Sequence, residues 1–197
     1  MTSADIASLV RSLPEGTQLV ETHISWVILT DEYAYKFKKP VHYSFLDFSD
    51  LGKRLLNCER ELELNRRLAP TVYLAVVAVH AIGEGFVLEA GQEADGPIVE
   101  YALKMRRLDT AMEMDLMLAK GRIDVAYMGV LARCVADFHR KATVISAPQQ
   151  SSAAGYRSDF NDILGQSAVF ESSLGSSAGA RLAAVVAASD RFLQAHA

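Results

Sequence analysis

The stretch YAYKFKKP, residues 33–40, has the composition of a buried β-strand but carries a lysine near its middle. Lys36 lies inside the segment, and Lys38 and Lys39 follow before Pro40. Burying an unpaired ammonium group is unfavourable, so a lysine at a half-buried strand position requires a partner or a route to solvent. Finding that partner is the main functional question that the sequence raises.

The residues around this stretch predict a helix and strands before it and a long helix after it. An amphipathic helix is expected near the N-terminus, with Thr2 or Ser3 as its cap, and two strands follow at 18–22 and 25–30. VHYSFLDFS, residues 41–49, is expected to be an aromatic loop. The long helix begins at Asp50 and stops at Pro70. Its apolar positions fall near a 3.6-residue period: Leu51, Leu55, Cys58, Leu62 and Leu68 or Ala69.

The second half of the chain changes from strands to helices. Three strands are expected at 72–80, 86–90 and 97–105, and none after Met105. A loop at 145–155 separates helical patterns at 110–121 and 124–142 from those at 156–175 and 177–197. Runs of strands followed by runs of helices predict an α+β fold rather than an alternating parallel sheet.

Composition narrows the class of protein. The chain has 197 residues. Its net charge is −4, so it lacks the basic character typical of nucleic-acid-binding proteins. The N-terminus lacks a signal-peptide core, and no apolar run is long enough to span a membrane. We therefore expect a cytoplasmic protein with no membrane partner. Cys58 and Cys134 lack metal-ligand spacing, which predicts two buried thiols in a reducing compartment.

The long helix offers carboxylates that could pair with the strand lysine. Glu59, Glu61 and Glu63 are all available, and residues two apart on a helix do not share a face. We therefore expect one of the three glutamates to point at Lys36 and the other two to face solvent. The alternative is that all three are solvated and that Lys36 reaches water along its own aliphatic stem.

The order of elements matches the small lobe of a kinase, in which a strand lysine holds the α- and β-phosphates and a helix glutamate holds the lysine. Five segments extend this match: residues 21–40, 45–49 (FLDFS), 58–70 (CERELELNRRLAP), 100–108 (EYALKMRRL) and 135–142 (VADFHRKA). Together they resemble the aminoglycoside-phosphotransferase-like family of protein-kinase-like fold. The likeness is to its bifunctional aminoglycoside phosphotransferase/ATP-binding type, over residues 17–142.

The resemblance implies a domain organisation and a set of binding residues. Residues 1–105 would form a kinase-like small lobe, a twisted antiparallel sheet with one long helix, and residues 106–197 an incomplete helical large lobe. Lys36 would bind phosphate and Glu61, with Glu59 as the alternative, would position it. Ser25 and the backbone of Thr22–Ser25 would replace a glycine-rich loop. The backbone near Lys104, Met105 and Arg106 would bind adenine.

The chain lacks the residues that would complete phosphoryl transfer. No His-x-Asp sequence occurs, so we assign no catalytic residue and no metal ligand. The resemblance implies ATP as cofactor, with Mg²⁺ only if the rest of the large lobe is supplied. The predicted function is the N-terminal portion of an ATP-dependent small-molecule phosphotransferase, inactive alone and with an unknown acceptor. The alternative is a truncated pseudokinase, a non-catalytic nucleotide-binding or interaction module that self-associates through exposed apolar surface.

Overall fold

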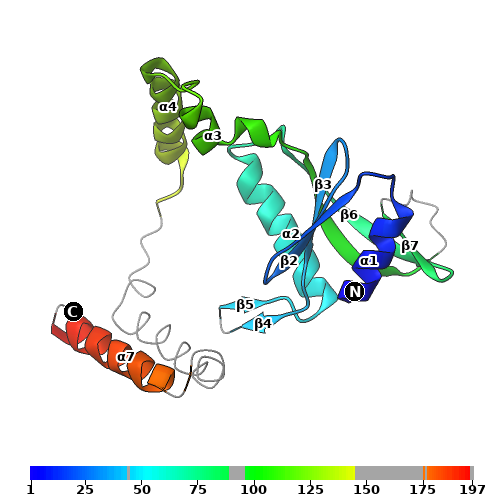
Figure 1. Ribbon diagram of the computed structural model, residues 1–197, viewed down its shortest axis with the longest axis horizontal. Coiled ribbons are helices and arrows are strands. Elements are labelled where there is room, and N and C mark those ends of the chain that lie inside the picture. The colour runs from blue at the N-terminus through cyan, green and yellow to red at the C-terminus, as the bar shows by residue number, and fades with distance from the viewer. Residues whose placement is uncertain (44, 89–95, 145–174, 176, 196–197) are drawn as a thin grey trace. The chain divides into compact units, whose positions relative to one another are not determined.

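The computed structural model describes residues 1–43, 45–88, 96–144, 175 and 177–195, and the chain divides into two compact units, Met1–Lys141 and Ala142–Ala197 (Figure 1). Strands precede most of the helices, which confirms the α+β class. The described elements are α1 (Ser3–Ser12), β1 (Gln18–Glu21), β2 (Ser25–Leu29), β3 (Tyr33–Lys38), β4 (His42–Tyr43), β5 (Leu46–Asp47), α2 (Leu51–Arg66), β6 (Tyr73–Ile82), β7 (Gly85–Leu88), β8 (Ile98–Arg106), η1 (Thr110–Met112), α3 (Met114–Ala119), α4 (Val125–Lys141) and α7 (Ser177–Ala195).

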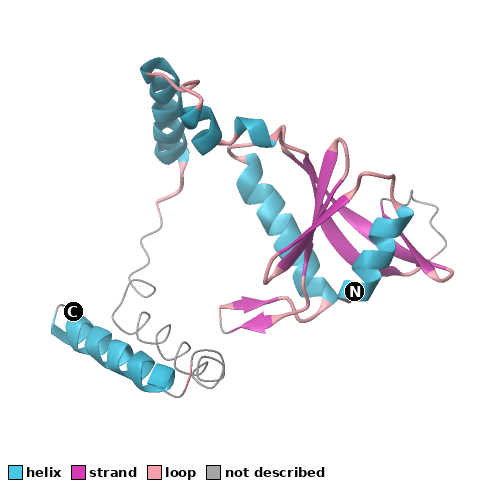
Figure 2. Cartoon of the chain, in the orientation of Figure 1, coloured by secondary structure: helices cyan, strands magenta, loops and turns pink. Residues whose placement is uncertain are grey.

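Six strands form one antiparallel sheet in the order β1-β2-β3-β8-β6-β7 (Figure 2). β3, which carries the strand lysine, lies in the interior of this sheet between β2 and β8. Its register places Lys36 opposite Val27 on one side and opposite Leu103 on the other. Because both edges of β3 are paired, its side-chain directions are fixed by the ladder on either side.

One face of the sheet packs against α1. The helix begins with a capping box, in which the Thr2 hydroxyl accepts from the Asp5 amide and the Asp5 carboxylate accepts from the Thr2 amide. Ile6 and Leu9 of α1 are fully buried against the sheet. They pack in one apolar core with Trp26, Ile28, Tyr35, Phe37, Val79 and Ala102. Tyr35 and Phe37 alternate with Lys36 along β3, so the lysine must point to the other face.

The long helix α2, which was predicted over residues 50–70, packs against the other face of the sheet. The Asp50 side chain caps it by accepting a 2.8 Å hydrogen bond from the Lys53 amide. Cys58 of α2 is fully buried, as expected, whereas Leu68 lies beyond the end of the helix and is exposed. Arg54 is buried as well and donates to both oxygens of Glu100 on β8, at 2.9 and 3.0 Å. This ion pair joins α2 to the centre of the sheet.

The segment predicted as an aromatic loop contains a short hairpin instead. β4 and β5 pair antiparallel, with His42 opposite Asp47 and Tyr43 opposite Leu46. The Lys53 ammonium binds the Asp47 carboxylate at 2.6 Å and so joins the hairpin to the first turn of α2. The stretch carries none of the Asn-Gly or Asp-Gly pairs that mark tight hairpins, which is why its sequence did not predict one.

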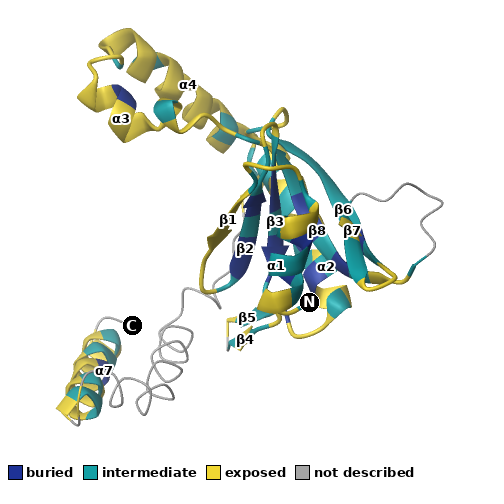
Figure 3. Ribbon diagram, turned by 45° about the vertical axis from the view of Figure 1, so that its right-hand side comes forward, coloured by how far each residue is buried: buried dark blue, intermediate teal, exposed yellow. Residues whose placement is uncertain are grey.

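The helices after β8 are largely exposed. Figure 3 shows α4 exposed over most of its surface, and none of its residues is buried. Cys134 lies on this helix and is exposed, so the prediction of a buried thiol at that position is wrong. None of the described helices is long and apolar enough to cross a membrane. The boundary predicted between 105 and 106 falls at the end of β8. The loop predicted at 145–155 and residues 156–174 of the helix predicted at 156–175 lie outside the described residues.

Candidate functional site

The strand lysine and the helix glutamate are in direct contact. Lys36 Nζ lies 2.8 Å from Glu61 Oε1, and this bond joins β3 to α2. Glu59 is exposed, and Glu63 is exposed and bonds Arg60 on its own helix at 3.1 Å. The expectation that one of the three glutamates points at Lys36 is therefore confirmed, and that one is Glu61. The alternative in which all three are solvated is wrong.

A second lysine shares the same carboxylate. Lys38 Nζ lies 2.8 Å from Glu61 Oε2, so each oxygen of Glu61 accepts from one ammonium group. The Lys36 side chain is 30% exposed, whereas that of Lys38 is 6% exposed. Lys38 is not among the site residues predicted from the sequence. The two-residue period of a strand, which places Lys36 and Lys38 on one face, was the signal that would have found it.

The electrostatics of this cluster follow from its burial and its charges. Burial raises the pKa of the Glu61 carboxyl, but hydrogen bonds from Lys36 and Lys38 and their positive charges outweigh it, so the pKa lies below its ordinary value. Burial also raises the pKa of the neighbouring Cys58 thiol to about 11. Glu61 is thus ionised at neutral pH, Cys58 is a neutral thiol, and the three charged groups leave an excess of one positive charge.

Ser25 lies beside this cluster on the neighbouring strand. It is directly opposite Lys38 in the β2–β3 ladder, so both side chains lie on the same face of the sheet. Ser25 is 2% exposed, and its hydroxyl oxygen has no hydrogen-bond partner among the described residues. Its backbone amide is already bonded to the Thr22 hydroxyl at 3.0 Å. The backbone amide of Ser25 is therefore used within the fold, whereas its hydroxyl bonds none of the described residues but is buried, so a ligand reaches that hydroxyl only if the groups covering it move.

The residues expected to bind adenine occupy the end of β8. Met105 is half-buried and lies opposite Ala34 of β3, whereas Arg106 is exposed at the last position of the strand. The Arg106 amide donates to the Val72 carbonyl at 2.8 Å, and the Arg107 amide donates to the Glu32 carbonyl at the same distance. Both amides are thus used within the fold, and the Arg106 amide could bind a base only after releasing Val72.

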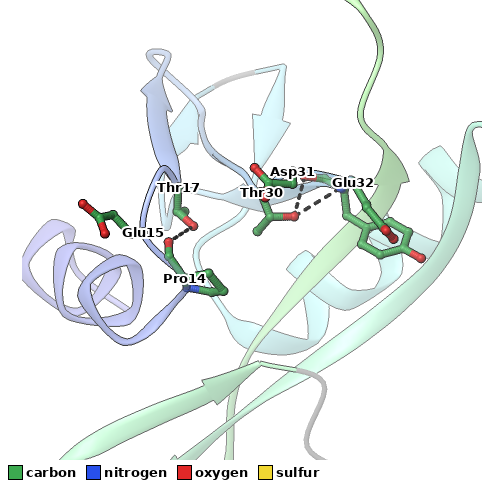
Figure 4. A pocket seen from close by; sticks show the side chains of 7 residues that line it. Pro14, Glu15, Thr17, Thr30, Asp31 and Glu32 are labelled. Atoms are coloured by element: carbon green, nitrogen blue, oxygen red, sulfur yellow. Dashed lines mark hydrogen bonds between the residues drawn. The ribbon is translucent and has the colours of Figure 1, made fainter.

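Figure 4 shows a shallow depression of about 290 Å³ that no residue of the lysine cluster lines. Its lining residues come from the α1–β1 loop and the β2–β3 turn: Pro14, Glu15, Thr17, Thr30, Asp31, Glu32 and Tyr33. Three of these side chains are carboxylates, which repel a phosphate group. The depression is therefore a poor candidate for a nucleotide site, and Lys36 and Glu61 do not line it. Within the described ranges, no cluster of His, Cys, Asp and Glu side chains could hold a metal ion.

Comparison with known proteins finds relatives of unassigned function. The chain is 31% identical over 122 residues to the uncharacterized protein Rv2004c of Mycobacterium tuberculosis and, equally, to the uncharacterized protein Mb2027c of Mycobacterium bovis. The match covers 62% of this chain but only 22% of each relative, so the chain spans about a fifth of their length. No protein-family model matches the sequence, and no solved structure matches it.

Proposed function

We propose that the sheet and α2 form the nucleotide-binding small lobe of an ATP-dependent small-molecule phosphotransferase of protein-kinase-like fold. The observation that carries this proposal is the 2.8 Å contact between Lys36 of β3 and Glu61 of α2. In kinases, an ion pair between a strand lysine and a helix glutamate holds the lysine where it binds the α- and β-phosphates. Lys36 would bind the α- and β-phosphates of ATP in this way, and Glu61 would fix the direction of the Lys36 side chain.

The surroundings of Lys36 suit this role. Its side chain is partly exposed, and the cluster carries excess positive charge, as a site for phosphate oxygens requires. The buried Ser25 hydroxyl, which has no partner in the described residues, adds a hydrogen-bond donor on the same face. Met105, which is half-buried and lies opposite the buried Ala34 on the neighbouring strand, would offer apolar surface to a base. Transfer itself would depend on a catalytic aspartate and metal ligands that we assign to no residue of this chain.

Calorimetric titration with MgATP tests the proposal on the 197-residue chain. We expect the wild type to bind and Lys36→Met to lose about tenfold or more in affinity, which corresponds to roughly 1.4 kcal/mol. Lys39→Met is the matched control, because Lys39 pairs at 2.5 Å with the exposed Glu21 and not with Glu61. The control should bind as the wild type does. Absence of binding at millimolar MgATP, or equal affinities for wild type and Lys36→Met, would refute the proposal.

A second candidate function is a non-catalytic interaction module. It is favoured by the apolar side chains that α4 exposes, among them Val125, Val130 and Val135. Sedimentation velocity at several protein concentrations distinguishes the two candidates together with the MgATP titration. An interaction module would associate without binding nucleotide, and the phosphotransferase lobe would bind MgATP in whatever oligomeric state it has.

A further inference from the structure

Lys36 and Lys38 make the same contact with Glu61 but lie in different surroundings. Both ammonium groups are 2.8 Å from a Glu61 oxygen. Lys38 is enclosed, because its ammonium also lies over the ring of the buried Phe48, 4.8 Å from the centroid. Lys36 keeps about a third of its side chain exposed. An anion arriving from solvent would therefore meet Lys36, whereas Lys38 is covered.

Because Lys38 also pairs with Glu61, it affects whether the Lys36 ammonium can move away from that carboxylate. If Lys36 were the only partner of Glu61, turning its ammonium toward a phosphate would leave a largely buried carboxylate without a cation. Leaving a buried charge uncompensated is strongly unfavourable, so such a lysine would be held back by its glutamate. With Lys38 bound to the other carboxylate oxygen, Glu61 stays paired when Lys36 moves.

We propose that Lys38 is a positioning residue that keeps Glu61 paired and in place, so that Lys36 can engage the phosphate groups of a nucleotide without leaving an unpaired carboxylate. This inference rests on the proposed function of Lys36 and assigns Lys38 no contact with the ligand. It also separates two neighbouring lysines by role: the exposed one binds, and the covered one holds the carboxylate between them.

A double-variant cycle with MgATP tests the inference by calorimetry. Lys38→Met should lower affinity about tenfold in the wild-type chain and less than about twofold in the Lys36→Met chain, because Lys38 acts only through Lys36. Lys38→Arg, which keeps the charge, should restore binding. Lys38→Gln replaces the methionine variant if that variant does not fold. Additive losses would mean that Lys38 contacts phosphate directly and would overturn the inference.

A titration without nucleotide gives the second readout. Lys36 and Lys38 of β3 are the charged groups that act on Glu61. Cys58 of α2 lies beside them, and Glu100 of β8, which acts on Cys58, is itself paired with Arg54 of α2. Because the Cys58 thiol, with its pKa raised to about 11, stays neutral below pH 7, it does not contribute to the titration that the carboxyl ¹³C resonance of Glu61 follows. Lys38→Met should raise the pKa of Glu61, because only Lys36 is then left to offset the effect of burial on the carboxylate.

The two readouts separate failure of the inference from failure of the proposed function. A wild-type chain that binds no MgATP refutes the proposed function, and the inference about Lys38 falls with it. A wild type that binds, together with a Lys38→Met variant that binds equally well, refutes the inference alone. An unchanged pKa of Glu61 in Lys38→Met refutes the inference whatever the nucleotide result, because Lys38 would then not be holding the carboxylate.

Discussion

Replacing Arg54 by methionine should destabilise the first unit of the chain more than any surface substitution on α2. The Arg54 side chain is 6% exposed and its partner Glu100 is fully buried. Arg54 Nε donates to both carboxylate oxygens, and the guanidinium also donates to the Phe48 carbonyl at 3.0 Å. Methionine fills a similar length of apolar space but supplies neither the charge nor the donors.

The size of this loss in folding free energy depends on which contacts Glu100 keeps when Arg54 is replaced. Removing one member of a buried ion pair costs about 3–5 kcal/mol, because the other charge is left uncompensated. Glu100 would keep the Tyr101 amide at 3.1 Å and the Met1 ammonium at 3.4 Å, so we expect a loss near the lower end, about 3 kcal/mol. That is a decrease of roughly 100-fold in the folding equilibrium constant.

Urea unfolding followed by tryptophan fluorescence measures this loss. Trp26 is the single tryptophan of the chain and is buried in the core of the sheet, so its emission reports on the first unit alone. Arg60→Met is the control on the same helix: Arg60 pairs with Glu63 at the surface, and its loss should change the free energy of unfolding by less than about 0.5 kcal/mol. A loss below about 1 kcal/mol for Arg54→Met would show that Glu100 is not held in a buried pair.

Two further predictions follow from local contacts. Thr2→Ala removes the hydroxyl that accepts from the Asp5 amide at the start of α1, so thermal unfolding should show a loss of about 1 kcal/mol. The two thiols should differ in their reaction with an aromatic disulfide reagent: the exposed Cys134 reacts in the native protein, whereas Cys58, buried and with its pKa raised to about 11, reacts only as urea unfolds the chain. Equal native rates would contradict the burial of Cys58.

The sequence predicted the elements whose own residues carry strong periodic patterns. The alternation in Tyr33–Lys38 and the apolar spacing of α2 identified both elements, and the structure confirms them. The hairpin of β4 and β5 was missed because its turn lacks the usual glycine or asparagine signal. Cys134 was predicted to be buried, since cysteine usually is, but no part of α4 is buried among the described residues. Whether a helix residue is buried depends on which other element packs against it, and the order of residues within the helix does not specify that element.

The candidate site was predictable in part. The pairing of Lys36 with Glu61 could be anticipated from the order of elements and the resemblance, although periodicity alone left three glutamates open. The bond of Arg106 to Val72 could not be anticipated, because it depends on how the loop before β6 meets the end of β8. Nor does the sequence reveal that the Ser25 hydroxyl is buried and has no hydrogen-bond partner in the described part of the chain, which depends on the register of β2 against β3.

The difference between the two lysines shows why a motif alone does not assign a role. Strand alternation places Lys36 and Lys38 on one face, and one glutamate serves both, so the sequence already contains two cations for one carboxylate. Only the fold decides which cation is covered, because Phe48, which follows the hairpin, lies over Lys38. Had Phe48 covered Lys36 instead, the same sequence motif would present Lys38 to solvent, and the phosphate-binding role that we propose for Lys36 would fall to Lys38. If the proposed function holds, Phe48 therefore decides which of the two lysines is open to a phosphate group, and Phe48→Ala should alter MgATP affinity without touching either lysine.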